Sequence, residues 1–222
     1  MTTSLPALSL LETRVLGVLV EKQHTVADTY PLTLNALIAG CNQKTSRDPV
    51  LSATDAEVQS TVDRLKSLSL IVESSGGRVM RYAHNVERVL GLQSQAVALL
   101  ATLMLRGPET LGELRINSDR LHRFADISAV DAFLQELAAR PSGALVAELA
   151  RAPGSRENRW MHLLSGVLPQ DIVPADGSVP LAGDVVTVSE IAALKANVRH
   201  LEEELEALKN TVANLCSELG GT

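Results

Sequence analysis

The stretch that decides the fold runs from Thr54 to His84 and reads TDAEVQSTVDRLKSLSLIVESSGGRVMRYAH. It opens on the spacing of a capping box, in which the side chains of Thr54 and Glu57 satisfy free backbone groups at the start of a helix. Apolar residues then recur at helical intervals from Val58 to Leu68. Two short β-prone runs follow on either side of Gly76-Gly77, a pattern typical of a hairpin. A helix followed directly by a hairpin predicts the second part of a winged helix-turn-helix unit.

Two further helices are expected before this stretch. Ser9 and Glu12 have the spacing of another capping box, and apolar residues follow at helical intervals up to Leu19. A second helix is expected from Pro31, a favourable residue for a first helical turn, to about Cys41. Three helices and then a hairpin give the element order of a winged-helix domain, which we predict over residues 1–85.

The same order of elements returns after residue 86. QAVALLATLMLRG matches the first helix, TLGELR the second and ISAVDAFLQELAAR the third, and ALVAELARAPGSRENRWMHLLS predicts a second hairpin with its turn at Pro153-Gly154. Internal repetition at a spacing of about 80 residues argues for two copies of one domain. We therefore predict a second winged-helix domain over residues 86–166, and a mainly α-helical fold of the α+β class with small β-hairpin wings.

The remaining residues have a different character. Residues 167–186 are rich in proline and glycine and predict an extended linker. Residues 187–219 predict a coiled-coil helix, because apolar residues are spaced alternately by three and four and leucine alternates with β-branched residues, as in parallel dimers. The alternative is a helix that packs back onto the body. The residues expected to form the contact of a homodimer are Ile191, Leu194, Val198, Leu201, Leu205, Leu208, Val212 and Leu215.

The formal net charge of −6 is unevenly distributed. The two predicted domains each carry equal numbers of basic and acidic residues, so the whole acidic excess lies in residues 167–222. A neutral body neither favours nor excludes a DNA partner. Aromatic residues make up 2% of the chain, which argues against a module that stacks on single-stranded nucleic acid.

Several classes of protein are disfavoured by what the chain lacks. Cys41 and Cys216 stand in no metal-ligand spacing, so we expect neither a metal site nor a cofactor. Glu12 and Arg14 interrupt the first apolar run, which is therefore not a signal peptide. No uncharged apolar run is long enough to cross a membrane, and a cytoplasmic protein is expected.

Four quoted stretches together resemble the bacterial YceH family: LSLLETRVLGVLVEKQ, YPLTLNALIAGCNQKTSRDPV, VDRLKSLSLI and RVMRYAHN. The resemblance covers nearly all of residues 8–165, and CNQKTSRDPV is its most specific part. It implies a cytoplasmic protein of two tandem winged-helix domains. It implies no particular function, because the family is uncharacterised.

The polar stretch CNQKTSRDPV, residues 41–50, lies between the second and third predicted helices. In a helix-turn-helix the third helix enters the major groove and neighbouring loops contact phosphates, so Lys44 and Arg47 are candidate phosphate contacts. In the alternative, Asn42 caps the second helix, Arg47 pairs locally with Asp48, and the loop satisfies its own polar groups while it orients the third helix. The sequence leaves both interpretations open.

The third helix and the hairpin give a mixed picture. Asp55, Glu57 and Asp63 would repel phosphates, although exposed polar residues on the same helix have the chemistry to contact base edges. In the second domain Asp131, Gln135 and Glu136 occupy the corresponding helix, which favours packing or protein contact there. The candidate residues for binding nucleic acid are Lys44, Arg47, Gln59, Ser60, Arg64, Arg78 and Arg81.

No motif of a phosphate-binding loop, a metalloprotease or a nucleophilic hydrolase is found, so we expect a protein that is not an enzyme. The first hypothesis is a dimeric DNA-binding protein, a transcriptional regulator that binds a palindromic site on double-stranded DNA. The alternative is a non-catalytic protein-interaction or assembly module that uses tandem winged helices as a scaffold.

Overall fold

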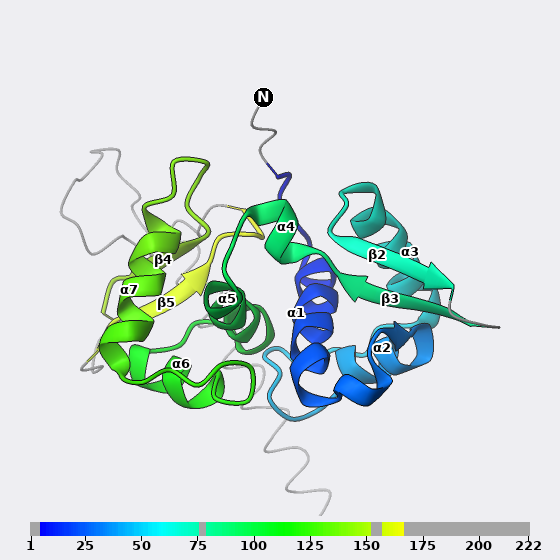
Figure 1. Ribbon diagram of the computed structural model, residues 1–222, viewed down its shortest axis with the longest axis horizontal. Coiled ribbons are helices and arrows are strands. Elements are labelled where there is room, and N and C mark those ends of the chain that lie inside the picture. Colours follow the sequence, from blue (N-terminus) through cyan, green and yellow to red (C-terminus); the bar gives the residue numbers. More distant parts are fainter. Residues whose placement is uncertain (1–4, 76–78, 152–156, 167–222) are drawn as a thin grey trace, which may run out of the picture. The chain divides into compact units, whose positions relative to one another are not determined.

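Helices and two small antiparallel sheets make up the part of the chain that the computed structural model describes, residues 5–75, 79–151 and 157–166 (Figure 1). The fold is therefore mixed α/β. All the described residues belong to one compact unit. The predicted linker and the predicted coiled-coil positions from Ile191 to Leu215 lie outside the described residues.

The first half begins its two long helices where the capping boxes predict. The Ser9 side chain accepts a hydrogen bond from the backbone N–H of Glu12, whose carboxylate accepts one from the N–H of Ser9, and Thr54 and Glu57 repeat this arrangement. The elements of this half are α1 (Leu10–Thr25), the 3-10 helix η1 (Ala27–Thr29), β1 (Leu32–Thr33), α2 (Leu34–Cys41), α3 (Asp55–Ser67), β2 (Ile71–Ser75) and β3 (Met80–His84).

The predicted start of the second helix at Pro31 is wrong. Leu32 and Thr33 form β1, which pairs with Tyr82 and Arg81 of β3 in a sheet of order β1-β3-β2. Strand pairing requires extended backbone, so α2 starts only at Leu34, where the Thr33 hydroxyl accepts a hydrogen bond from the N–H of Ala36.

The second half repeats this topology, including its strand pairing. Glu109, just before the helix capped by Thr110, forms an antiparallel bridge with Trp160, much as β1 pairs with β3 just before the helix capped by Thr33. The predicted helices and hairpin strands of this half are confirmed, whereas the short helix that links the halves was not predicted. The elements are α4 (Val86–Leu90), α5 (Ser94–Arg106), α6 (Leu111–Asn117), α7 (Ile127–Ala138), β4 (Val146–Leu149) and β5 (Arg159–His162).

The two halves pack together through α1 and α5, which lie side by side at the centre of Figure 1. Both helices are buried on all sides over most of their length. Gly17 makes the approach close, because a Cβ atom at this position would lie 2.9 Å from the Leu105 side chain. Within the described ranges, no helix combines the length and the apolar character needed to cross a membrane.

We predict that Gly17→Val destabilises the protein by separating α1 from α5. Inserting methyl groups into a packed core costs about 1–3 kcal/mol, since neighbouring side chains leave their preferred rotamers. Urea unfolding would measure the loss. Leu105→Ala in the same chain makes room for the added valine, so the double variant should lose less than the two single losses together. Strictly additive losses would contradict the close contact.

Candidate nucleic-acid interface

The loop between α2 and α3 is closed by an amide. Asn42 lies at the C-terminal cap of α2, and its side chain pairs with the backbone of Ala53 in both directions. The Asn42 Nδ2 donates to the Ala53 carbonyl, and the Ala53 N–H donates to Asn42 Oδ1, each at 2.8 Å. The Asn42 amide thus bonds to Ala53 as the backbone of a neighbouring strand would, and it links the two ends of the loop.

Arg47, a predicted phosphate contact, is buried inside the protein. Its Nη2 lies 2.6 Å from the Oε2 of Glu21 on α1, and its Nη1 lies 3.2 Å from the Oε1 of the same carboxylate. Nε donates to the carbonyl of Gly40, and Nη1 also donates to the carbonyl of Ser46. The side chain has 0% exposure, so its guanidinium is not available to a DNA phosphate. Its ionic partner is Glu21 and not the neighbouring Asp48.

The Glu21 carboxylate is held in its charged form by this pair. Burial raises its pKa, but the hydrogen bonds and the charge of Arg47 outweigh burial and bring the pKa below the ordinary value of 4.5. A carboxylate with a lowered pKa stabilises the fold above its ordinary pKa. That stabilisation is lost as the pH falls through the lowered value.

A second buried arginine, Arg14 on α1, holds the end of α2 and the middle of the loop. Its Nη1 donates to the carbonyl of Cys41 at 3.3 Å, and its Nη2 donates to the carbonyl of Pro49 at 2.6 Å. This role of Arg14 was not predicted from the sequence, although a signal existed. A charged residue inside an otherwise apolar helical run is a buried group that needs partners.

The loop also bonds to the second half of the molecule. The N–H of Asp48 donates to the carbonyl of Leu105, and Arg106 Nη2 donates to Ser46 Oγ, both at 2.8 Å. Ser46 holds a left-handed backbone with φ of 58°, which is uncommon for a residue with a side chain. The polar loop therefore joins α1, α2 and α5, and most of its hydrogen-bonding capacity is used internally.

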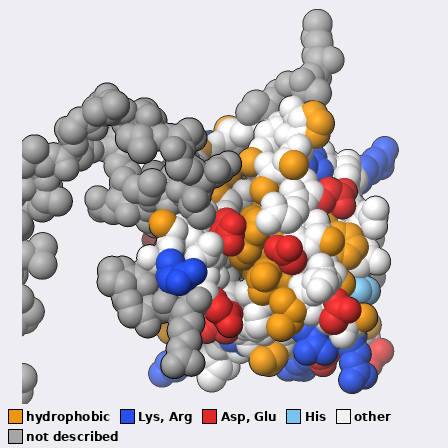
Figure 2. All heavy atoms as spheres, turned by 90° about the vertical axis from the view of Figure 1, so that its left-hand side faces the viewer, with side chains coloured by type: hydrophobic (Ala, Val, Ile, Leu, Met, Phe, Trp, Pro, Cys, Tyr) orange, Lys and Arg blue, Asp and Glu red, His pale blue; other side chains and the backbone are white. Residues whose placement is uncertain are grey.

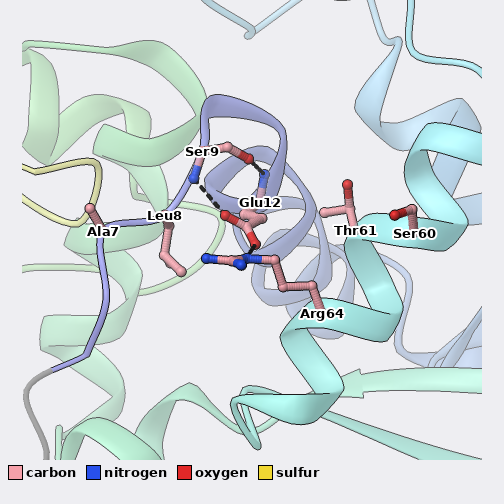
Figure 3. A pocket seen from close by; sticks show the side chains of 7 residues that line it. All are labelled: Ala7, Leu8, Ser9, Glu12, Ser60, Thr61 and Arg64. Atoms are coloured by element: carbon pink, nitrogen blue, oxygen red, sulfur yellow. Dashed lines mark hydrogen bonds and ion pairs between the residues drawn. The ribbon is translucent and has the colours of Figure 1, made fainter.

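Arg64, a predicted base contact on α3, turns toward α1. Its Nε lies 2.5 Å from Oε1 of Glu12, whose side chain is only 4% exposed. Figure 3 shows this ion pair in a cavity of about 420 Å³ between α3 and the start of α1. Ser60 lines the same cavity and is exposed, and Gln59 donates to Asp63 on its own helix. Glu12 therefore both caps α1 and binds α3 to it.

The hairpin offers little free charge. The guanidinium of Arg81 donates to the carbonyls of Thr29 and Pro31 at 3.0 and 2.7 Å, and Arg78 lies outside the described residues. Lys44 is exposed, and its ammonium has no hydrogen bond or ion pair to any described residue. Every exposed residue on the described part of the hairpin is uncharged. These residues are Val72, Ser74, Ser75, Val79 and Met80.

Arg47→Ala should lower the free energy of unfolding by about 3–5 kcal/mol at neutral pH, because it removes the guanidinium that donates to both oxygens of the half-buried Glu21 carboxylate. Lys44→Ala is the matched control in the same loop and should change stability by less than about 0.5 kcal/mol. In Arg47→Ala only Lys22 remains beside the carboxylate, and protonation relieves the half-buried charge. The difference from the wild type should therefore shrink as the pH falls below 4.5. Denaturant unfolding across this pH range measures it, and a constant difference would contradict the pair.

Comparison with known proteins identifies relatives over nearly the whole chain. A family model described as a protein of unknown function, DUF480, matches residues 8–155. A UPF0502 protein of Dechloromonas aromatica is 59% identical over 209 residues, which are 94% of this chain and 96% of the relative. UPF0502 proteins of Burkholderia multivorans and Burkholderia pseudomallei are 58% and 57% identical, and each match covers 98% of this chain and 91% of the relative. The chain belongs to the DUF480/UPF0502 family of uncharacterised bacterial proteins.

Proposed function

We propose that the chain is a non-catalytic interaction protein built from two winged helix-turn-helix units, and that α3 together with the β2–β3 hairpin binds another protein. The observation that carries the proposal is the uncharged exposed surface of the described part of the hairpin, residues 71–75 and 79–84. Val72, Val79 and Met80 are 50%, 56% and 41% exposed. A wing that contacts phosphates needs cations at such positions, whereas exposed apolar side chains on a rigid hairpin are typical of a protein interface.

The charges on α3 support the same partner class. Asp55, Glu57 and Asp63 are all exposed on this helix. Its two cations are already paired, Arg64 with Glu12 and Lys66 with Glu73. The helix therefore presents an acidic surface, which would repel a phosphate backbone and attract basic side chains of a protein.

The second half also presents a surface suited to protein contact. Figure 2 faces the side on which α7 lies and shows a band of hydrophobic side chains with carboxylates along it, while basic side chains gather toward the lower edge. Ile116 on α6 and Ile127 at the start of α7 are 73% and 47% exposed. Mixed apolar and acidic surface of this kind does not suit a polyanion.

Three titratable groups with strongly shifted pKa values, Cys41, His84 and His162, owe the shift chiefly to burial. Burial raises the pKa of the Cys41 thiol to about 12, which keeps it protonated and unreactive at neutral pH. Burial likewise lowers the pKa of both His84 and His162 to about 4, so both imidazoles are neutral. These groups support a role in packing, in keeping with a protein that is not an enzyme.

Val72→Asp combined with Met80→Asp should abolish partner binding while the fold persists, because the two residues are 50% and 41% exposed and belong to no buried core. Full-length protein would be immobilised and exposed to lysate of a bacterium that encodes it. We expect the wild type to retain one protein at a fixed ratio. The retained amount of this protein should fall at least tenfold with the double variant. Val50→Asp is the matched control, a charge placed at a 54% exposed apolar site outside α3, the hairpin and the surface of the second half. Equal retention by all three chains would exclude the hairpin as the binding surface.

DNA binding is the second candidate function. The helix-loop-helix-hairpin order favours it, as does the free ammonium of Lys44 in the loop before α3. A dimeric regulator of this kind would require a palindromic site.

We also propose that the chain dimerises through residues 191–215. A monomeric mass in light scattering at micromolar concentration would be contrary evidence. We propose in addition that the family is the YceH family and that the protein is cytoplasmic.

Lys44→Ala separates the two candidate functions. If Lys44 contacts one phosphate, the slope of log affinity against log salt should become less steep by about 0.9. Fluorescence anisotropy with sheared duplex DNA at several salt concentrations measures this slope. Under the protein-binding proposal, the wild type instead shows no saturable DNA binding at physiological salt, and Lys44→Ala behaves identically.

A further inference from the structure

A small cavity lies where the two halves meet, on the side of the loop that faces α5 and α6. Its volume is about 50 Å³, which corresponds to roughly four water molecules. Residues from α1, the loop, α5 and α6 contribute to its wall, among them Thr25, Ser46, Arg106, Asn117 and Arg120. The cavity is therefore built by both halves and depends on their packing.

Two arginines at this cavity have no carboxylate partner. Arg106 donates through Nη2 to Ser46 Oγ, and Arg120 is exposed. Among the described residues, neither guanidinium forms an ion pair with a carboxylate. Two guanidinium groups at one small cavity repel each other unless an anion lies between them.

Two carboxylates, those of Glu21 and Glu109, lie near the cavity. Glu21 lines it, but both its oxygens accept from Arg47 and one of them also lies 3.1 Å from the ammonium of Lys22. Glu109 is buried and accepts a hydrogen bond from Asn117 at 2.6 Å. Arg47 and Lys22 lie beside Glu21, and the charge of Arg106 acts on Glu109. These two carboxylates face four cations once Arg120 is included, so positive charge is in excess at the cavity.

We propose that this cavity binds a terminal phosphate group, held between Arg106 and Arg120 with the Ser46 hydroxyl as a further hydrogen-bonding group. A terminal phosphate carries about two negative charges at neutral pH and presents three oxygens to a guanidinium fork. The small volume accepts one tetrahedral anion. A phosphodiester fits poorly, because its two ester substituents would both have to extend out of the cavity. It also brings only one negative charge to the two arginines. The ligand is therefore inorganic phosphate or a small molecule that ends in phosphate.

Such a ligand would act on the contact between the halves. Ser46 belongs to the loop of the first half, whereas Arg106 and Arg120 belong to the second. A phosphate bound by both stabilises the joined arrangement by mass action, without any change at the hairpin. The site is thus independent of the proposed protein-binding surface, and the two can be tested separately.

Thermal unfolding of the full-length protein in a phosphate titration tests the proposal. Sodium chloride keeps the ionic strength constant, and adenosine 5′-monophosphate and duplex DNA are separate arms. We expect the midpoint to rise saturably with inorganic phosphate, with the monophosphate, or with both; the arm that binds tighter identifies the source. Isothermal calorimetry then gives the dissociation constant.

Arg120→Gln is the decisive variant, because Arg120 has no ionic partner in the described chain and its loss should leave the fold intact. We expect the dissociation constant for phosphate to rise at least tenfold. Arg123→Gln removes the same charge three residues away, outside the cavity wall, and should bind as the wild type does. The proposal is overturned by the absence of saturable phosphate binding, by equal losses in the two variants, or by an effect of Arg120→Gln confined to duplex DNA.

Discussion

The buried ion pair between Arg47 and Glu21 is the interaction on which the rest of the structure depends. Removing a guanidinium from water is costly, and the cost is offset only when its N–H groups find acceptors. Here the acceptors are the Glu21 carboxylate and the backbone carbonyls of Gly40 and Ser46. Arg47 fixes the path of the loop between α2 and α3, and Arg14 on α1 holds this path at Cys41 and at Pro49.

The same loop fixes how the two halves meet. Its Asp48 N–H and Ser46 hydroxyl bond to α5, which packs against α1 at Gly17. The orientation of α3 and the packing of the halves are therefore coupled through one segment. This coupling explains why a connecting loop is so rich in hydrogen-bonding side chains. It also explains part of the charge placement, because Arg14, Arg47 and Arg81 use their N–H groups inside the protein.

Local signals in the sequence predicted much of the fold. The capping boxes at Ser9 and Thr54 fixed two helix starts, and the repeated order of elements predicted the second half. The start of α2 was mispredicted because pairing of Leu32 with Tyr82 joins residues 50 positions apart. The role of Arg47 was open for the same reason, since its partner Glu21 lies 26 residues earlier. Charge patterns show which residues are basic, whereas only the tertiary packing decides which of them are buried.

The most direct test of the locked loop is native-state hydrogen exchange of two backbone amides. The Asp48 N–H is bonded to Leu105 on the other half, and the Ala53 N–H is bonded to the side chain of Asn42. If the loop is part of the core scaffold, both amides should exchange only through openings nearly as costly as those of α1. Exchange of both amides at rates near those of an unfolded peptide would show a freely moving loop, and would contradict the role given to Arg47.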